Sequence, residues 1–416
     1  MSKHNTIINR TIVHCECKTM KALKSIVFVL TIFTTYVAAD RKLHVEFNPG
    51  CPLEDHCSKF SKLTYIRADG ENDTVHFVLD ATFKPSLVVI VTNKDAVIQV
   101  NYTDDRDNNI KFTESPLYTF ASVFNNLYEF NDVNDTANIQ NGKNFIKMDF
   151  KKFNWNTTQS INNNNESVEI LLSANSYRAP GINKTGIVSV TLKVYGKKDT
   201  GSKLPHLVHT PESGELTLTL NNLTTNFTKS RFAIELLTFS SFPFNKSEEL
   251  SSNTFSDDKL SGGTFLNYLL NAKGNVEGGG FLSWKPVVYK AENTHALNSS
   301  STIQYEIQDH LYENDWINTP LFNMYGNSLF GNSSQFLLKS FNVSFGQPND
   351  EFYAKSNYTY WTFLVGIGTP PHSSLGFLEL SIIASLLLML TITMILIFCI
   401  FMRWMSSKRN SIVYGQ

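Results

Sequence analysis

One short string in this chain has the residue types of an enzyme active site. Asp199-Thr200-Gly201-Ser202 has the local form of an aspartic-protease loop. That chemistry requires two carboxylates that share a proton, and hence two such loops. The chain has no second copy, and Lys197-Lys198 precede the string where the protease has an apolar strand. Because the G-x-S-x-G and H-E-x-x-H motifs are also missing, we expect that the chain is not an enzyme.

Two other groups of residues have the types that bind cations. Asp104-Asp105-Arg106-Asp107 offers clustered carboxylates, which suit calcium, but Ile110 occupies the EF-hand glycine position and no glutamate closes the loop. This favours a solvated acidic turn. His206 and His209 are three residues apart and would bind a metal only with further ligands. We therefore predict no catalytic residues, no metal site and no cofactor.

The residues that do indicate chemistry are acceptors of N-linked glycans. Asparagine occurs 42 times in 416 residues, and thirteen asparagines between residues 40 and 375 stand in Asn-x-Ser/Thr sequons. A glycan is bulky, so an occupied sequon must lie on the surface. The predicted acceptors are Asn72, Asn101, Asn134, Asn156, Asn165, Asn183, Asn222, Asn226, Asn245, Asn298, Asn332, Asn342 and Asn357.

Of the five cysteines, Cys15 and Cys17 lie near the N-terminus and Cys399 lies in an apolar segment near the C-terminus. Cys51 and Cys57 remain, and an oxidising lumen should join them in a disulfide, with two free thiols as the alternative. The loop between them is short, so we expect stabilisation at the low end of the usual ~2–4 kcal/mol.

Two apolar segments predict the compartment of these residues. Met20–Asp40 has the lysines, apolar stretch and small-residue site of a cleaved signal peptide, which assigns residues 1–39 to it, with Met20 as an alternative start. Leu380–Met402 has 23 residues without a charge, roughly 35 Å of helix, which is enough to span a bilayer. The basic residues after it place the C-terminus in the cytosol, as in a type I membrane protein; a GPI signal is the alternative.

The body between these segments alternates apolar and polar residues with a period of two, which predicts an antiparallel all-β ectodomain of the β-sandwich type. Thr191, Lys193, Thr217, Thr219 and Lys339 should face water while their neighbours face the core. Leu117–Phe130 fits either a helix or a strand and turn. The strand candidates are Thr74–Ala81, Ser86–Asn93, Val97–Thr103, Gly186–Gly196, Glu215–Leu223, Arg231–Phe239, Thr302–Gln308 and Phe336–Gly346.

A stretch rich in Pro, Gly and charge at Lys197–Gly214 suggests a division of the ectodomain into two packed modules. The predicted parts are the signal peptide, module 1, module 2, the transmembrane helix and the cytosolic tail, at residues 1–39, 40–204, 205–375, 376–402 and 403–416. With 36 basic and 37 acidic residues, the net charge of −1 gives no reason to expect nucleic acid as a partner. A homodimer is compatible with the sequence.

Seven blocks, in order along the chain, resemble the glycosylated lysosomal membrane protein family. They are Leu63–Asn93, Phe120–Ala137, Phe153–Asn156, Leu204–Thr210, Phe281–Tyr289, Phe341–Gly346 and Tyr360–Pro371. The resemblance implies a heavily glycosylated type I protein of the lysosomal membrane. It further implies an accessory subunit whose lumenal domain binds a lysosomal major-facilitator transporter of dipeptides and protects it from proteolysis.

The chain departs from the family in having no cysteine in the second half of the ectodomain, and its tail shows neither a complete tyrosine motif nor an acidic dileucine motif. Lysosomal delivery is therefore expected from the resemblance, or through the signal of a partner. Within Tyr360–Pro371 we expect part of the partner contact, with an aromatic belt at the membrane interface as the alternative. A cell-surface adhesion or receptor ectodomain is the alternative function, and a lumenal hydrolase is disfavoured.

Overall fold

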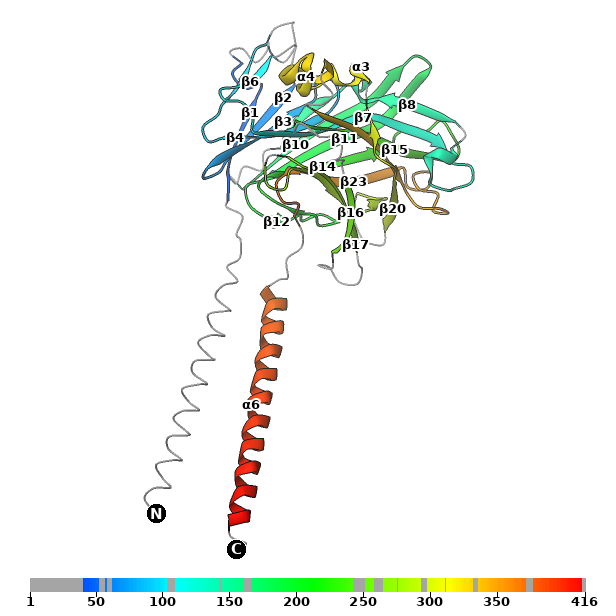
Figure 1. The fold of residues 1–416 in the computed structure, drawn as a ribbon. Helices are drawn as coiled ribbons and strands as arrows, with labels where there is room; N and C mark the ends of the chain where they lie inside the picture. The colour runs from blue at the N-terminus through cyan, green and yellow to red at the C-terminus, as the bar shows by residue number, and fades with distance from the viewer. Residues whose placement is uncertain are drawn as a thin grey trace. The chain divides into compact units, whose positions relative to one another are not determined.

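The computed structural model describes residues 40–51, 57, 62–102, 109–142, 144–160, 166–241, 251–257, 265–274, 276–292, 298–310, 312–331, 336–371 and 377–413. The predicted signal peptide, the acidic turn at Asp104 and the last residues of the tail lie outside this part of the chain. Within it, β-strands dominate from Asp40 to Pro371, and one long helix follows (Figure 1).

The first half of the chain supplies most of an antiparallel ladder in the order β1-β2-β3-β4-β7-β15-β22. β8 also pairs with β7, and β20 and β21 pair with β22. The bounds are β1 Lys42–Phe47, β2 Leu63–Asp69, β3 Asp73–Asp80, β4 Ser86–Asn93, β7 Tyr118–Asn131, β8 Phe145–Asp149, β15 Ser230–Ser240, β20 Ser299–Gln304, β21 Gln308–Asp309 and β22 Leu337–Phe345.

A second antiparallel ladder has the order β9-β10-β11-β14-β23-β18-β17-β16. β19 pairs with β23 and β20, so β20 joins the two ladders into one sheet of 19 described strands. The bounds are β9 Asn156–Ser160, β10 Ser167–Ala179, β11 Ile182–Tyr195, β14 Ser213–Asn221, β16 Ser251–Asp257, β17 Phe265–Ala272, β18 Gly280–Trp284, β19 Val287–Tyr289 and β23 Tyr358–Ile367.

The main core lies between the two ladders, because each contributes one apolar face to it. Phe124 of β7 and Phe363 of β23 meet there, with ring centroids 5.8 Å apart. On β11 the buried Val188, Val190 and Leu192 alternate with polar neighbours, as period-two burial requires. The short elements beside the ladders are β5 Ile98–Val100, β6 Ile110–Phe112, β12 Asp199–Thr200, β13 Val208–His209, η1 Ile139–Asn141 and η2 Phe150–Lys152.

A second, smaller core covers the other face of the first ladder. Short helices follow β21, and Trp316 and Leu321 from them pack with Val88, Val123 and Phe239 of the sheet. The first ladder is therefore buried on both faces. On the outer face of the second ladder, Leu207, which precedes β13, packs with Phe281 and Leu364, whereas β11 and β14 present polar side chains there. The helices are α3 Glu313–Trp316, α4 Pro320–Tyr325 and α5 Ser328–Gly331.

The helix interpretation of Leu117–Phe130 is wrong, because this segment forms β7. Its apolar residues recur at every spacing because both faces of β7 are buried, one in each core. A strand that is buried on both faces reads as a continuous apolar run, and periodicity alone does not distinguish such a run from a helix.

The antiparallel all-β class is confirmed, in the form of one large, nearly closed sheet. The predicted module boundary at residue 205 lies between β12 and β13. Strands from its two sides are hydrogen-bonded neighbours, since β14 pairs with β11 and β15 pairs with β7. The sandwich with two packed modules stays a prediction.

The C-terminal helix α6 runs from Phe377 to Val413. Its segment Ile382–Met405 is long and apolar enough to cross a membrane, and its side chains are not buried in the protein. Within the described residues it is one such helix, at the position expected from the sequence. A helix with apolar residues on all its faces needs lipid or protein around it, which agrees with a single C-terminal span.

Candidate functional site

The polar part of the outer face of the second ladder is hollowed into an open groove of about 350 Å³. β11 and β14 form its floor with the side chains that alternate away from the core. Thr191, Lys193 and Tyr195 come from β11, and Glu215 and Thr217 come from β14. The groove exists because these strands place polar side chains on one face over several consecutive pairs.

Strand register fixes which side chains meet on the floor of the groove. Lys193 lies opposite Glu215, and Thr191 lies opposite Thr217. On the other side of β14, Tyr360 of β23 lies opposite Thr219. Four of the five polar positions expected to face water thus face this groove, where Thr191, Lys193 and Thr219 are half-buried and Thr217 is buried. The fifth, Lys339 of β22, is half-buried and forms an ion pair with Asp309 at 2.7 Å.

Burial changes the ionisation of groups in and beside the groove. It raises the pKa of the Glu215 carboxyl to about 7; Lys193 opposes this rise, and the negative charge of Glu169 adds to it. Behind the groove, the ring of His209 stacks on that of Tyr195, and burial lowers the pKa of His209 to about 4. The imidazole is therefore uncharged at neutral pH, and it packs against the ring of Tyr195, which lines the groove.

The aspartic-protease-like string Asp199–Ser202 and the histidines His206 and His209 lie in one hairpin at the end of the groove. Asp199 of β12 pairs with His209 of β13, and His206 bonds through Nδ1 to the carbonyl of Gly201 at 2.7 Å. Ser202, in the turn, lines the groove. In the described part of the chain, no three His, Cys, Asp or Glu side chains lie close enough together to hold a metal ion.

The described glycan acceptors lie mainly at the surface. Asn298 and Asn342 are half-buried, and Asn165, Asn245 and Asn332 lie outside the described residues. The exposed acceptors are Asn72, Asn101, Asn134, Asn156, Asn183, Asn222, Asn226 and Asn357. Exposure is the condition for glycan attachment, and these eight residues meet it; their occupancy stays a prediction.

Two of the exposed acceptors lie side by side at one end of the groove. The backbone N–H of Asn222 donates to the carbonyl oxygen of Asn357 at 2.8 Å. Both residues have a positive φ, 51° and 49°, a conformation that asparagine tolerates better than most residues. The Nδ2 atom of Asn222, to which a glycan would be attached, donates to Oδ1 of Asn221 at 2.9 Å, and Asn221 lines the groove.

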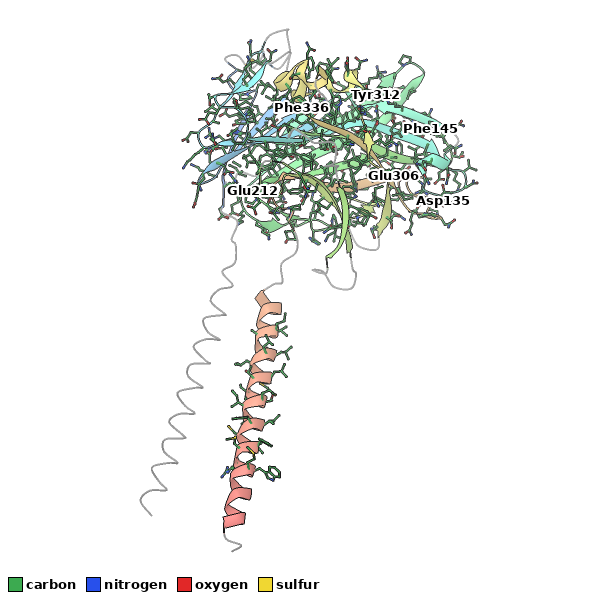
Figure 2. All side chains as sticks on the ribbon, viewed as in Figure 1. Asp135, Phe145, Glu212, Glu306, Tyr312 and Phe336 are labelled. Carbon is green, nitrogen blue, oxygen red and sulfur yellow. A yellow bond between two sulfur atoms is a disulfide. The ribbon has the colours of Figure 1, made fainter. Side chains whose placement is uncertain are left out.

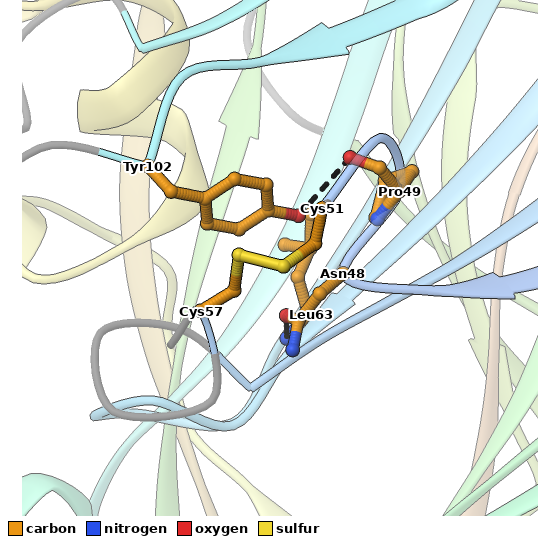
Figure 3. The surroundings of a disulfide bond; sticks show 6 residues. All are labelled: Asn48, Pro49, Cys51, Cys57, Leu63 and Tyr102. Atoms are coloured by element: carbon orange, nitrogen blue, oxygen red, sulfur yellow. Dashed lines mark hydrogen bonds between the residues drawn. A yellow bond between two sulfur atoms is a disulfide. The ribbon is translucent and has the colours of Figure 1, made fainter. Parts of the chain in front are cut away.

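The structure joins Cys51 and Cys57 in a disulfide that closes a loop before β2 (Figure 3). Two hydrogen bonds hold the same corner: the backbone N–H of Leu63 donates to Oδ1 of Asn48 at 3.1 Å, and the hydroxyl of Tyr102 donates to the carbonyl of Pro49 at 3.1 Å. The crosslink therefore closes a loop within the β1–β2 connection, and the hydrogen bond from Leu63 at the start of β2 holds the beginning of this connection against the first ladder.

The expectation that Tyr360–Pro371 contributes a partner contact or a membrane belt is wrong for most of the segment. It lies in β23, which pairs with β14 on one side and with β18 and β19 on the other. Trp361 and Phe363 are fully buried in the main core. Aromatic residues close to a membrane span in sequence indicated an interface, but here they form the central strand of a ladder.

Comparison with known proteins decides the family. The family model described as glycosylated lysosomal membrane protein matches residues 62–409. The chain belongs to this family. The match runs from β2 into α6 and so includes both ladders and the membrane-spanning segment. The single C-terminal span agrees with a type I member of this lysosomal membrane protein family.

Relatives in the glycosylated lysosomal membrane protein family are similar over most of their lengths. Glycosylated lysosomal membrane protein B of Xenopus laevis is 26% identical over 357 residues, which cover 83% of this chain and 85% of the relative. The Danio rerio protein is 25% identical over 356 residues (82% and 84%), and the Mus musculus protein is 28% identical over 337 residues (77% and 79%).

A solved galactose 1-epimerase from Lactobacillus acidophilus aligns with 79% of this chain and 99% of its own length. Its identity is 9% and the TM-score is 0.31, so no argument rests on it.

Proposed function

We propose that this chain is an accessory subunit of a lysosomal major-facilitator transporter of dipeptides. Its lumenal body binds the transporter and protects it from lysosomal proteases, and it is not an enzyme. The observation that supports this most is the combination of a membrane-spanning α6 with a β body whose eight exposed acceptors lie on several different elements. A glycan coat of this kind obstructs the approach of a protease to whatever the body covers.

The backbone of the body is itself a poor protease substrate. Proteases cut exposed, unpaired segments, whereas most described backbone between β1 and β23 is hydrogen-bonded in ladders. Anchoring by α6 also holds the body beside other proteins of the same membrane. A weak contact is then sufficient, because the two partners are confined to a small volume.

Large apolar side chains that stand out from the body are candidates for the contact. Phe145 of β8 and Tyr312 before α3 are 60% and 73% exposed (Figure 2). Among the described strands, β8 pairs only with β7, so Phe145 lies on an edge strand. Exposed aromatic residues contribute much of the binding energy in many interfaces.

Co-purification from lysosomal membranes tests the proposal. The tagged chain should recover the transporter, and replacing residues 40–375 with an unrelated glycosylated domain on the same α6 should abolish recovery. Phe145→Ala with Tyr312→Ala should weaken recovery, whereas Lys147→Ala, an exposed control on the same strand, should not. Undiminished recovery after replacement of the body contradicts the proposal. Localisation at the plasma membrane without lysosomal markers favours the adhesion alternative instead.

A further inference from the structure

The groove on the second ladder has the dimensions of an extended ligand. Along β11 it runs from Ile187 to Tyr195, eight residue steps or ~26 Å at the usual rise of a strand. It is open along this length, and its volume of about 350 Å³ is within the range of ligand sites. A linear oligomer fits such a trough better than a compact metabolite does.

The chemistry of the lining suits a carbohydrate. Hydroxyl, carboxylate and amide groups such as those of Thr191, Glu215 and Asn221 can exchange hydrogen bonds with sugar hydroxyls. The half-buried Tyr358 adds aromatic surface for the apolar C–H face of a sugar ring, and the largely buried Tyr360 lies beside it in the lining. A peptide or lipid with large apolar groups would instead leave these polar groups without partners.

The charge of the lining disfavours a polyanion. Glu169 and Glu292 balance Lys193 and Lys203, and Glu215, with its raised pKa, adds at most one further negative charge, so the lining has no excess of positive charge. A ligand with many phosphates or sulfates needs an excess of positive charge, which the lining lacks. Neutral sugars have no such requirement.

A source of oligosaccharide lies at the end of the groove. The Nδ2 atom of Asn222 is 2.9 Å from Oδ1 of Asn221, a lining residue, so a glycan on Asn222 begins at the groove. The bond to the carbonyl of Asn357 at 2.8 Å fixes the backbone of this acceptor. Attachment in the same chain gives the glycan a high effective concentration at the groove, so individual contacts need not be strong.

We propose that the groove is an oligosaccharide-binding site, and that the N-linked glycan on Asn222 of the same chain lies in it. The occupied groove covers the polar part of the outer face of the second ladder, and the glycan in turn becomes inaccessible to lysosomal glycosidases. This inference rests on glycosylation of Asn222 and not on the transporter role.

Native deglycosylation of the full-length glycoprotein tests the proposal. Release of each glycan by an amidase is followed by site-resolved mass spectrometry. We expect release from Asn222 to be at least about tenfold slower than from Asn72, an exposed acceptor on the β2–β3 turn. Thr191→Trp, which fills the middle of the groove, should remove this difference. If the tryptophan prevents folding, Lys193→Ala is the second variant, and it should reduce the same difference between Asn222 and Asn72.

A second arm separates the attached glycan from a free one. Asn222→Asp removes the acceptor and keeps a residue that tolerates positive φ, with Asn72→Asp as the matched control. The Asn222→Asp protein should bind the released, purified N-glycan, and its Thr191→Trp derivative should not. Equal release from Asn222 and Asn72, an absent glycan on Asn222, or protection at Asn357 in place of Asn222 overturns the proposal.

Discussion

Lys184 of β11 and Glu129 of β7 form an ion pair in which both side chains are fully buried. The pair joins the two ladders across the main core. Glu129 also accepts hydrogen bonds from the backbone N–H of Asn226 at 2.6 Å and from the hydroxyl of Ser230 at 2.5 Å. Because Asn226 follows Asn222 in the loop between β14 and β15, this buried pair also positions the loop that carries these two predicted glycan acceptors.

Replacing Lys184 with methionine should therefore lower the free energy of unfolding by ~3–5 kcal/mol, because Glu129 would stay buried without a counter-charge. Thermal unfolding of the full-length protein in detergent measures the loss. Lys184→Met combined with Glu129→Gln should recover part of it, since glutamine removes the unpaired charge and still accepts from Asn226. A single variant as stable as the parent would show that the pair is not needed.

Arg231 of β15 ties the loop before β23 to the loop after β7. Its side chain is 2% exposed and donates to Asp132 at 2.8 Å, to Asp350 at 3.0 Å and to Asp135. Lysine cannot reproduce this planar fork, so Arg231→Lys should cost about 2–4 kcal/mol in the free energy of unfolding. Arg178→Lys, at an exposed position of β10, is the control and should stay within about 0.5 kcal/mol. Equal losses in the free energy of unfolding for the two variants would show that the planar guanidinium of Arg231 is not needed to join these loops.

The raised pKa of Glu215 predicts a pH effect with a definite sign. Folding raises this pKa from 4.5 to about 7, so between these values the folded state binds more protons than the unfolded state. The carboxyl thus favours folding most fully below pH 4.5, and this contribution is lost as the pH rises to 7. Relative to Glu215→Gln, the parent should lose about 1–2 kcal/mol across this range, after a reduction for its partial exposure in the groove.

Tm measured from pH 4.5 to 7.5 for both proteins gives this difference directly. Other groups with shifted pKa values, such as His209, are common to the two proteins and cancel in the comparison. A difference in Tm that does not change with pH would mean that Glu215 is ionised throughout the range.

The Cys51–Cys57 disulfide closes a short loop, with a sequence separation of 6 residues. The entropy model of crosslinks gives about 2 kcal/mol for such a loop. Cys51→Ser with Cys57→Ser should lower the free energy of unfolding by this amount without loss of the fold, because hydrogen bonds from Leu63 and Tyr102 hold the same corner. Failure of the double variant to fold would show that the crosslink is essential.

The fold class and the membrane span could be predicted from sequence because each rests on a local pattern. Alternation along β11 and β14 separated core from surface residues, and 23 uncharged residues indicated a span. The helix or strand character of β7 could not be predicted, because a segment buried on both faces has no polar period. The role of Trp361 was missed because proximity to the span in sequence says nothing about strand order.

The groove was also beyond sequence reasoning, although its residues were partly identified. Thr191, Lys193, Thr217 and Thr219 gave a signal as polar positions, but only strand register sets them side by side. The adjacency of Asn222 and Asn357 has no local signal at all, since it depends on the pairing of β14 with β23 across more than a hundred residues.

The half-life of the transporter in lysosomes tests the central claim most directly. It is measured by pulse–chase in cells that express either the full chain or α6 with an unrelated glycosylated domain in place of residues 40–375. The account predicts that the full chain lengthens the half-life by about threefold or more, and that a lysosomal protease inhibitor abolishes this difference. Equal half-lives with the two chains, in cells where both reach lysosomes, would contradict it.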